Sequence, residues 1–168
     1  MSRESVNRTG FTLVEVMVVL VIIGIAGAVV VPHMLSGGQF GVQAAARVVI
    51  ADIIYAQNEA VAHQSPRRVV FEPDNNRYML TDTAGTTMTV SWKSSAQENY
   101  IVDFEQDQRF SGVTLENVDF GGMMMVEFDD MGSPISGGTL ELIAAGFRYR
   151  ITVAAFTGQV TIESVPGG

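Results

Sequence analysis

The sequence contains no cysteine, so it can form neither a disulfide nor a thiolate site. Basic residues are also few: Lys and Arg number 10 against 18 Asp and Glu, which gives a formal net charge of −8. Proteins that bind nucleic acids obtain much of their affinity from Lys and Arg that displace counterions from phosphates. The composition therefore argues against nucleic-acid binding, and the 168 residues indicate one domain with an appendage.

The common catalytic signatures are also missing. The chain has no G-x-S-x-G, no P-loop, no G-x-G-x-x-G after a strand and no H-E-x-x-H. It has only two histidines, His33 and His63, and we interpret both as surface residues because no sequence feature joins them. We therefore expect a protein that is not an enzyme and needs no cofactor.

Two groups of carboxylates could in principle bind a hard cation such as calcium. Asp103, Glu105 and Asp107 alternate along one stretch, and Asp129 and Asp130 lie in a turn that contains glycine. Neither group has the spacing of a known calcium loop. We interpret both as solvated carboxylates and expect no metal site.

The most apolar part of the chain is residues 11–31, which contain only Thr12 and Glu15 as polar interruptions. As a helix these residues would extend over about 32 Å, which matches the hydrocarbon thickness of a bilayer. Arg3 and Arg8 precede the run, and the next basic residue is Arg47. The positive-inside rule then predicts a membrane-spanning helix with a cytoplasmic N-terminus and the remaining chain across the membrane.

Glu15 is unusual in such a helix. A carboxylate in an apolar span costs on the order of 2 to 3 kcal/mol and normally has a partner. No Lys or Arg follows within two helical turns. Cleavage after Gly10 would create an α-amino group on Phe11 one turn away, and the amine of a neighbouring subunit could serve equally well.

The segment Gly10-Phe11-Thr12-Leu13-Val14-Glu15-Val16, followed by the apolar run, resembles the class III signal of type IV prepilins and type II secretion pseudopilins. The resemblance implies that a prepilin peptidase cuts between Gly10 and Phe11 and methylates the new amine of Phe11. It also implies that Glu15 pairs with a neighbour's amine during filament assembly.

Gly24 and Pro32 lie where many members of this family have a helix-loosening glycine and a kinking proline. Pro32 could instead mark the end of the membrane span. Two other interpretations of the N-terminus remain. One is a secretory signal peptide cut after residues 26–28, Ala-Gly-Ala, and the other is an anchor that is never processed. Glu15 and the apolar residues up to Val31 argue against the signal peptide.

A second helix is expected over residues 40–64, continuous with the first through a loosening point at residues 36–38. One apolar stripe and one polar stripe follow the helical period. Asp52, Glu59 and His63 separate the apolar stripe from a narrower, weakly polar second stripe. The second stripe could contact either the sheet of the same domain or a neighbouring subunit. The first stripe comprises Val42, Val49, Ile53, Ala56 and Ala60; the polar one Gln43, Arg47, Gln57 and Asn58; the second Val48, Ala51, Tyr55 and Ala62.

From residue 67 onward the sequence alternates in short runs that predict strands, separated by clusters of turn-forming residues. No connection is long enough for a helical crossover, so the pairing should be antiparallel. The expected fold is α+β: a long N-terminal helix, membrane-spanning in its first half and amphipathic in its second, packed on an antiparallel sheet. The predicted strands are residues 67–72, 77–82, 88–93, 100–104, 113–120, 123–128, 139–143, 147–155 and 159–163.

Three methionines, residues 123–125, follow a pair of glycines. Thioethers adapt readily to irregular contact surfaces. Because the methionines lie in a predicted strand, we favour the interpretation that at least one of its faces belongs to the core.

The whole layout resembles the GspH/FimT-like minor pseudopilins, in which an Ala-rich helix leads into a β domain. Residues 151–162, with Thr157-Gly158 at their centre, and residues 128–142 are similar to the end of that domain. The expected organisation is a leader peptide (1–10), a transmembrane assembly helix (11–35), an amphipathic helix (36–66) and a β domain (67–168).

The resemblance implies a structural minor pseudopilin in the inner membrane. Its β domain would be periplasmic, and its partners would be prepilin peptidase and other pseudopilins or pilins. The alternative is a FimT-like minor type IV pilin that acts in pilus assembly or DNA uptake. DNA uptake would require a basic C-terminal tail, whereas this chain ends in Glu163-Ser-Val-Pro-Gly-Gly. Removal of the first ten residues would leave eight basic and 17 acidic side chains.

Overall fold

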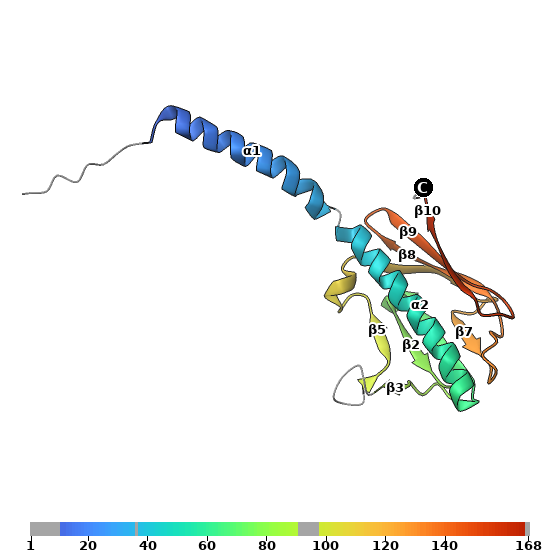
Figure 1. Cartoon of the computed structure of the whole chain (residues 1–168). Helices are drawn as coiled ribbons and strands as arrows, with labels where there is room; N and C mark the ends of the chain where they lie inside the picture. The colour runs from blue at the N-terminus through green and yellow to red at the C-terminus, as the bar shows by residue number, and fades with distance from the viewer. Residues whose placement is uncertain (1–10, 36, 91–97, 167–168) are drawn as a thin grey trace, which may run out of the picture. The chain divides into compact units, whose positions relative to one another are not determined.

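The computed structural model describes residues 11–35, 37–90 and 98–166, without the side chains of residues 27–37, 90 and 98. The chain divides into two compact units, Met1–Gly37 and Gly38–Gly168. Helix α1 (Leu13–Leu35) lies in the first unit, and α2 (Gly37–His63) with all strands forms the second (Figure 1). The predicted leader at residues 1–10 and the residue Ser36 lie outside this description.

Helix α2 is held in the second unit by one face of small and β-branched side chains. The predicted stripe is confirmed, and Ala45 and Ala46 extend it. The helix ends where Gln64 takes a left-handed conformation (φ 47°), two residues before Pro66. The fully buried residues of the stripe are Val42, Ala45, Ala46, Val49, Ile53, Ala56 and Ala60.

Within the described residues, the strands form two four-stranded antiparallel sheets and one short ribbon. The first sheet has the order β5-β2-β1-β7 and the second β10-β9-β8-β6, while β3 pairs with β4 in the ribbon. The antiparallel α+β fold is therefore confirmed. The bounds are β1 Arg67–Glu72, β2 Arg77–Thr81, β3 Thr89–Val90, β4 Glu98–Asn99, β5 Ile101–Asp103, β6 Thr114–Asp119, β7 Met125–Phe128, β8 Gly138–Ala144, β9 Phe147–Val153 and β10 Val160–Val165, with short 3₁₀ turns η1 Pro73–Asn75 and η2 Gln108–Phe110.

Two predicted strands differ from the structure. The strand expected at residues 88–93 is seen only as β3, because residues 91–97 lie outside the described part. The strand expected at residues 123–128 begins at Met125, because the bend that starts with Gly121 and Gly122 (φ 68° and 85°) continues through Met124. Met124 is 58 % exposed and Met125 is partly buried, so the expectation that these methionines lie in a strand was wrong for the first two.

The core of the second unit is aromatic and lies between α2 and the strands. Phe71 of β1 stacks on Phe120 with ring centroids 5.7 Å apart, and Tyr78 of β2 packs on both Phe71 and Phe104. Phe110, from η2, meets the edge of Phe104 at 5.6 Å. Rings at these separations contribute about 0.5 to 1.5 kcal/mol per pair beyond their buried area.

One polar side chain of α2 joins two distant loops. The Nε2 atom of Gln57 donates to the carbonyl oxygen of Gly132 at 2.7 Å and lies 3.5 Å from that of Thr157. Gly132 and Gly158 have φ values of 81° and 67°, and a Cβ atom at Gly158 would lie 2.5 Å from Gln57 Nε2. Glycine is therefore required on both loops where they meet this face of α2.

A buried carboxylate organises the second sheet. Glu141 of β8 accepts hydrogen bonds from Asn117 (2.7 Å), Arg148 (2.7 Å) and Arg150 (2.8 and 3.0 Å). Its side chain is 4 % exposed. The hydrogen bond from Asn117 and those from the two arginines hold the pKa of Glu141 below its ordinary value of 4.5.

We predict that Glu141→Gln lowers the free energy of unfolding at pH 7 by about 2 kcal/mol, because buried donors lose a charged acceptor. A lowered pKa stabilises the fold above the unfolded value, and this contribution is lost as the pH falls through the folded value. The variant should therefore lose less stability than the wild type between pH 5 and 3, as measured by denaturant unfolding. Glu163→Gln, at an exposed position, is the control and should change stability by less than about 0.5 kcal/mol. Equal losses from both variants would contradict the prediction.

Candidate functional site

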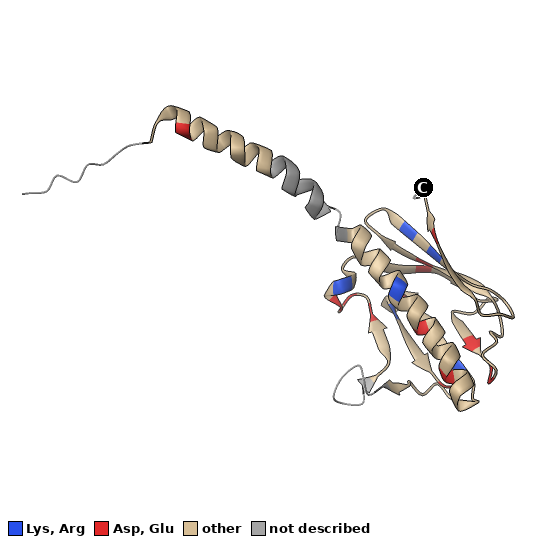
Figure 2. Ribbon diagram, viewed as in Figure 1, with Lys and Arg blue, Asp and Glu red and all other residues tan. Residues whose placement is uncertain are grey.

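The N-terminal end of α1 brings together the residues singled out from the sequence. Thr12 precedes the helix, and its Oγ1 atom accepts a hydrogen bond from the backbone N–H of Glu15 at 3.2 Å. Thr12 therefore caps α1, and the sequence Thr-x-x-Glu has the spacing of a capping box. A carboxylate in the first turn is also stabilised by the positive end of the helix dipole. Glu15 is the acidic residue of the first turn of α1, and Figure 2 shows a red segment near this end of the helix.

Phe11 and Glu15 line the same small groove, together with Val16, Val19 and Leu20. Its volume is about 260 Å³. The Phe11 side chain is 83 % exposed, and Glu15 is exposed as well, with no ion-pair partner among the described residues. The backbone at Phe11 and the carboxylate thus lie one helical turn apart on an apolar surface.

The other residues predicted for this segment are only partly described. Gly10 lies outside the described residues, and Pro32 lies within α1 without a described side chain. At Gly24 an added Cβ atom would meet nothing within 4 Å. Among the residues that the structure covers, no helix combines the length and the apolar character needed to cross a membrane.

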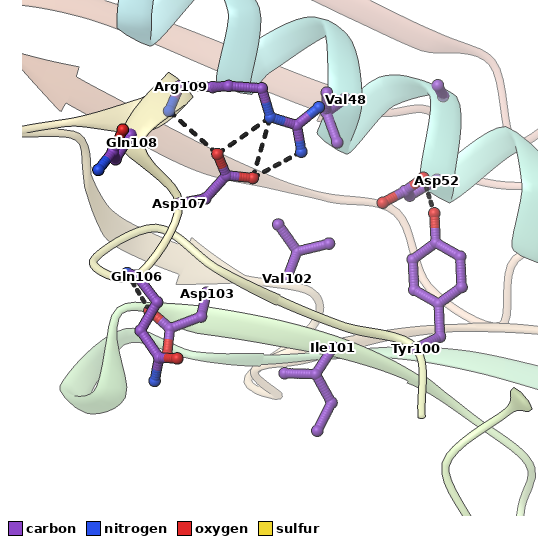
Figure 3. A pocket seen from close by; sticks show the side chains of 11 residues that line it. Val48, Asp52, Tyr100, Ile101, Val102, Asp103, Gln106, Asp107, Gln108 and Arg109 are labelled. Carbon is purple, nitrogen blue, oxygen red and sulfur yellow. Dashed lines mark hydrogen bonds and ion pairs between the residues drawn. The ribbon is translucent and has the colours of Figure 1, made fainter. Parts of the chain in front are cut away.

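A second candidate site lies in the folded domain, between α2, β5 and η2. It is an open groove of about 840 Å³, shown in Figure 3. Asp52 of α2 lies at one end, where it accepts hydrogen bonds from Tyr78 and Tyr100, both at 2.5 Å. Arg109 lies at the other end and forms an ion pair with Asp107 at 2.5 Å.

The polar groups at the Asp52 end of the groove bond to one another. The two phenol groups are donors to Asp52, and burial is the main cause that raises the pKa of both Tyr78 and Tyr100. The Asp52 residue is 5 % exposed, and its carboxylate joins the helix to Tyr78 of β2 and to Tyr100, which directly precedes β5. We interpret this cluster as a structural link between α2 and the first sheet.

The carboxylates considered for a cation form turns instead. Asp103 accepts from the backbone N–H groups of Glu105 and Gln106, and Asp129 accepts from those of Met131 and Ser133. Side chains that bond the backbone two residues ahead are typical of Asx turns. Within the described part of the chain, no three His, Cys, Asp or Glu side chains cluster as metal ligands would.

Residues 6–31 match the family described as the prokaryotic N-terminal methylation motif. This match covers Phe11, Thr12 and Glu15, the residues around the capped start of α1. The N-terminal segment of this chain is therefore prepilin-like.

Comparison with characterised proteins points in the same direction. The prepilin-like chain is 25 % identical over 155 residues to type II secretion system protein H of Xanthomonas campestris, covering 90 % of this chain and 80 % of that protein. It is also 36 % identical over 76 residues to type II secretion system core protein G of Aeromonas hydrophila, covering 45 % of this chain and 46 % of the relative. The chain therefore spans about half the length of this protein G.

Two solved structures share the fold. The minor pseudopilin EpsH from the type II secretion system of Vibrio cholerae superposes with a TM-score of 0.51 at 12 % identity, covering 73 % of this chain and 95 % of EpsH. The type IV minor pilin FimU of Pseudomonas aeruginosa gives a TM-score of 0.53 at 15 % identity, covering 73 % and 87 %. At these identities the likeness concerns the fold alone.

Sequence reasoning missed two of the polar clusters in this prepilin-like chain. Asp52 was taken as a polar separator between the stripes of the helix, and Glu141 was read only as part of a strand. A signal existed for Asp52, because an acidic residue between two apolar helix faces needs a donor and the strands carry tyrosines. His63 is exposed as expected, with Nδ1 3.2 Å from Glu59 Oε2.

We predict that the Asp52 cluster makes the fold sensitive to alkaline pH. The raised pKa values of Tyr78 and Tyr100 mean that the folded chain keeps protons that the unfolded chain loses near pH 10. Stability should be insensitive to these phenols below pH 10 and fall above it. Denaturant unfolding at pH 8, 10 and 11 would measure this. In the double variant Tyr78→Phe and Tyr100→Phe, stability should fall less between pH 10 and 11 than in the wild type. The prediction would be contradicted if both tyrosines of the folded wild type titrated at the ordinary pKa of tyrosine.

Proposed function

We propose that the chain is a structural subunit that is cut between Gly10 and Phe11 by a prepilin peptidase and methylated on the new amine. The observation that carries the proposal is the start of α1, where Thr12 caps the helix and Glu15 follows within one turn. Residues 6–31 match the N-terminal methylation motif, which supports the same processing. No catalytic role is proposed for any residue.

We further propose that the groove formed by Phe11, Glu15, Val16, Val19 and Leu20 is an assembly site. A methylated amine is a cation, and in an apolar environment a carboxylate strongly favours such a partner. The Glu15 carboxylate would pair with the Phe11 amine of a neighbouring subunit. The exposed apolar side chains around it would be covered by the helices of that neighbour.

In this proposal α1 anchors the chain in the bacterial inner membrane, with the N-terminus cytoplasmic and the β domain periplasmic. The support is the run of residues 11–31, interrupted only at Thr12 and Glu15, and the charge bias of Arg3 and Arg8 before it. Gly24 and Pro32 would loosen and bend this helix so that it can leave the bilayer and enter a filament.

Of the two filaments, the pseudopilus of a type II secretion system is our first choice. The relative aligned over 80 % of its length is a type II secretion protein H, and two shorter alignments are to core proteins G. A minor type IV pilin is the second candidate, because FimU shares the fold as closely as EpsH does. The acidic composition argues against a DNA-uptake role.

The first experiment identifies the N-terminal residue of the protein purified from membranes of cells with and without prepilin peptidase. Intact mass and terminal peptide sequencing should give a methylated Phe11 only when the peptidase is present. An intact Met1 in both strains would replace the proposal with an unprocessed anchor, and a start after residue 28 would replace it with a secreted protein.

The second experiment tests the assembly role of Glu15. Glu15→Leu should leave processing at Phe11 intact but lower incorporation into filaments about tenfold, since the loss of an ion pair worth about 1.4 kcal/mol changes an equilibrium tenfold. Quantitative immunoblotting of sheared filaments measures the ratio to the membrane pool. Glu116→Gln, at an exposed position of β6, is the control. Normal incorporation of the Glu15→Leu chain would refute the assembly role without affecting the processing proposal.

A further inference from the structure

Strand β10 forms one edge of the second sheet. It pairs with β9 on one side, and within the described residues no strand lies on its other side (Figure 1). Four of its six residues are exposed, and none is proline or lysine, the residues that commonly protect an edge. Such an edge can accept another strand through main-chain hydrogen bonds.

The hydrogen-bond pattern identifies which residues face this free edge. The N–H of Ala154 donates to the carbonyl of Gln159 at 2.9 Å, so Ala154 and Gln159 form a hydrogen-bonded pair. The next pair along the ladder, Val153 and Val160, is therefore a non-bonded pair. Bonded and non-bonded pairs alternate along an antiparallel ladder. Every second residue of β10 therefore turns its N–H and C=O groups away from β9; these residues are Val160, Ile162 and Ser164.

A row of alternating charged side chains crosses the second sheet and ends at this edge. Glu141 of β8 is opposite Arg150 of β9, which is opposite Glu163 of β10. Arg150 lies 2.8 Å from Glu141 and 3.3 Å from Glu163. The row thus alternates acidic, basic, acidic, and its last carboxylate has a side chain that is 62 % exposed.

We infer that the free edge of β10 binds an extended segment of another protein that has Lys or Arg opposite Glu163. Val160, Ile162 and Ser164 supply the main-chain bonds, and the cation continues the alternation of charge. Glu163 then occupies a non-hydrogen-bonded pair with the incoming strand, the position where opposite side chains approach most closely.

A second copy of this chain fits the edge less well. Strand β10 contains no basic residue, so a partner β10 could not supply the cation. Two copies also repel each other, because each has a formal charge of −8. The inference does not depend on processing or filament assembly, so it can fail or succeed independently of the proposed function.

The test uses the full chain in detergent micelles and two fluorescent peptides. One has the sequence Ser-Thr-Val-Thr-Lys-Thr-Val-Thr-Ser, and the other has Glu in place of Lys. Fluorescence polarisation should show that the Lys peptide binds and that the Glu peptide binds about fivefold more weakly. Glu163→Lys should reverse the order. Bound Lys peptide should also slow amide hydrogen exchange at Val160, Ile162 and Ser164.

Ser164→Pro provides the matched backbone control. It removes an outward N–H without removing a bond to β9, so the variant should keep its unfolding midpoint and lose most binding of the Lys peptide. Failure of the Lys peptide to bind the wild type, or equal binding of both peptides by the wild type, would overturn the inference. Self-association of the wild type that Ser164→Pro abolishes would also overturn it, because a second copy would then occupy the edge.

Discussion

The close contact between α2 and the strands depends on small side chains along one face of the helix. Ala45, Ala46, Ala56 and Ala60 are fully buried there, between larger aliphatic residues. These alanines belong to the same buried core as residues from both four-stranded sheets. A larger side chain at any of these sites would have to displace neighbours in this core, and close-packed interiors tolerate such insertions poorly.

Polar side chains of α2 fix the position of the helix on the strands, which apolar packing alone would leave adjustable. Asp52 joins the helix to Tyr78 of β2 and to Tyr100, which precedes β5, and Gln57 joins it to the loops at Gly132 and Thr157. Burial of apolar area has little directional preference, whereas hydrogen bonds require particular distances and angles. Together these hydrogen bonds fix the position of α2 along its axis and its rotation about that axis.

Many of the helices, strands and buried residues could be predicted from the sequence, and the predictions that failed did so for physical reasons. The helix stripe and strand β1 were predicted correctly because both depend on a local periodicity of apolar residues. The start of β7 was misplaced because Gly121 and Gly122 extend a turn through residues that have strand propensity. At the N-terminus the motif from Gly10 to Val16 could be read directly, since it is a local signal. The Asp52 and Glu141 clusters join residues far apart in the chain, and no local pattern encodes that pairing.

The long-range hydrogen bonds of Gln57 have a consequence for the order in which contacts form while the chain is being synthesised. Its two carbonyl partners lie 75 and 100 residues further along the chain. During synthesis from the N-terminus, α2 and the first strands β1 and β2 are therefore complete well before the two loops that Gln57 bonds. Contacts of such long sequence separation form late and slow folding. The hydrogen bonds of Gln57 can therefore form only after β7, β8 and β9 have been made.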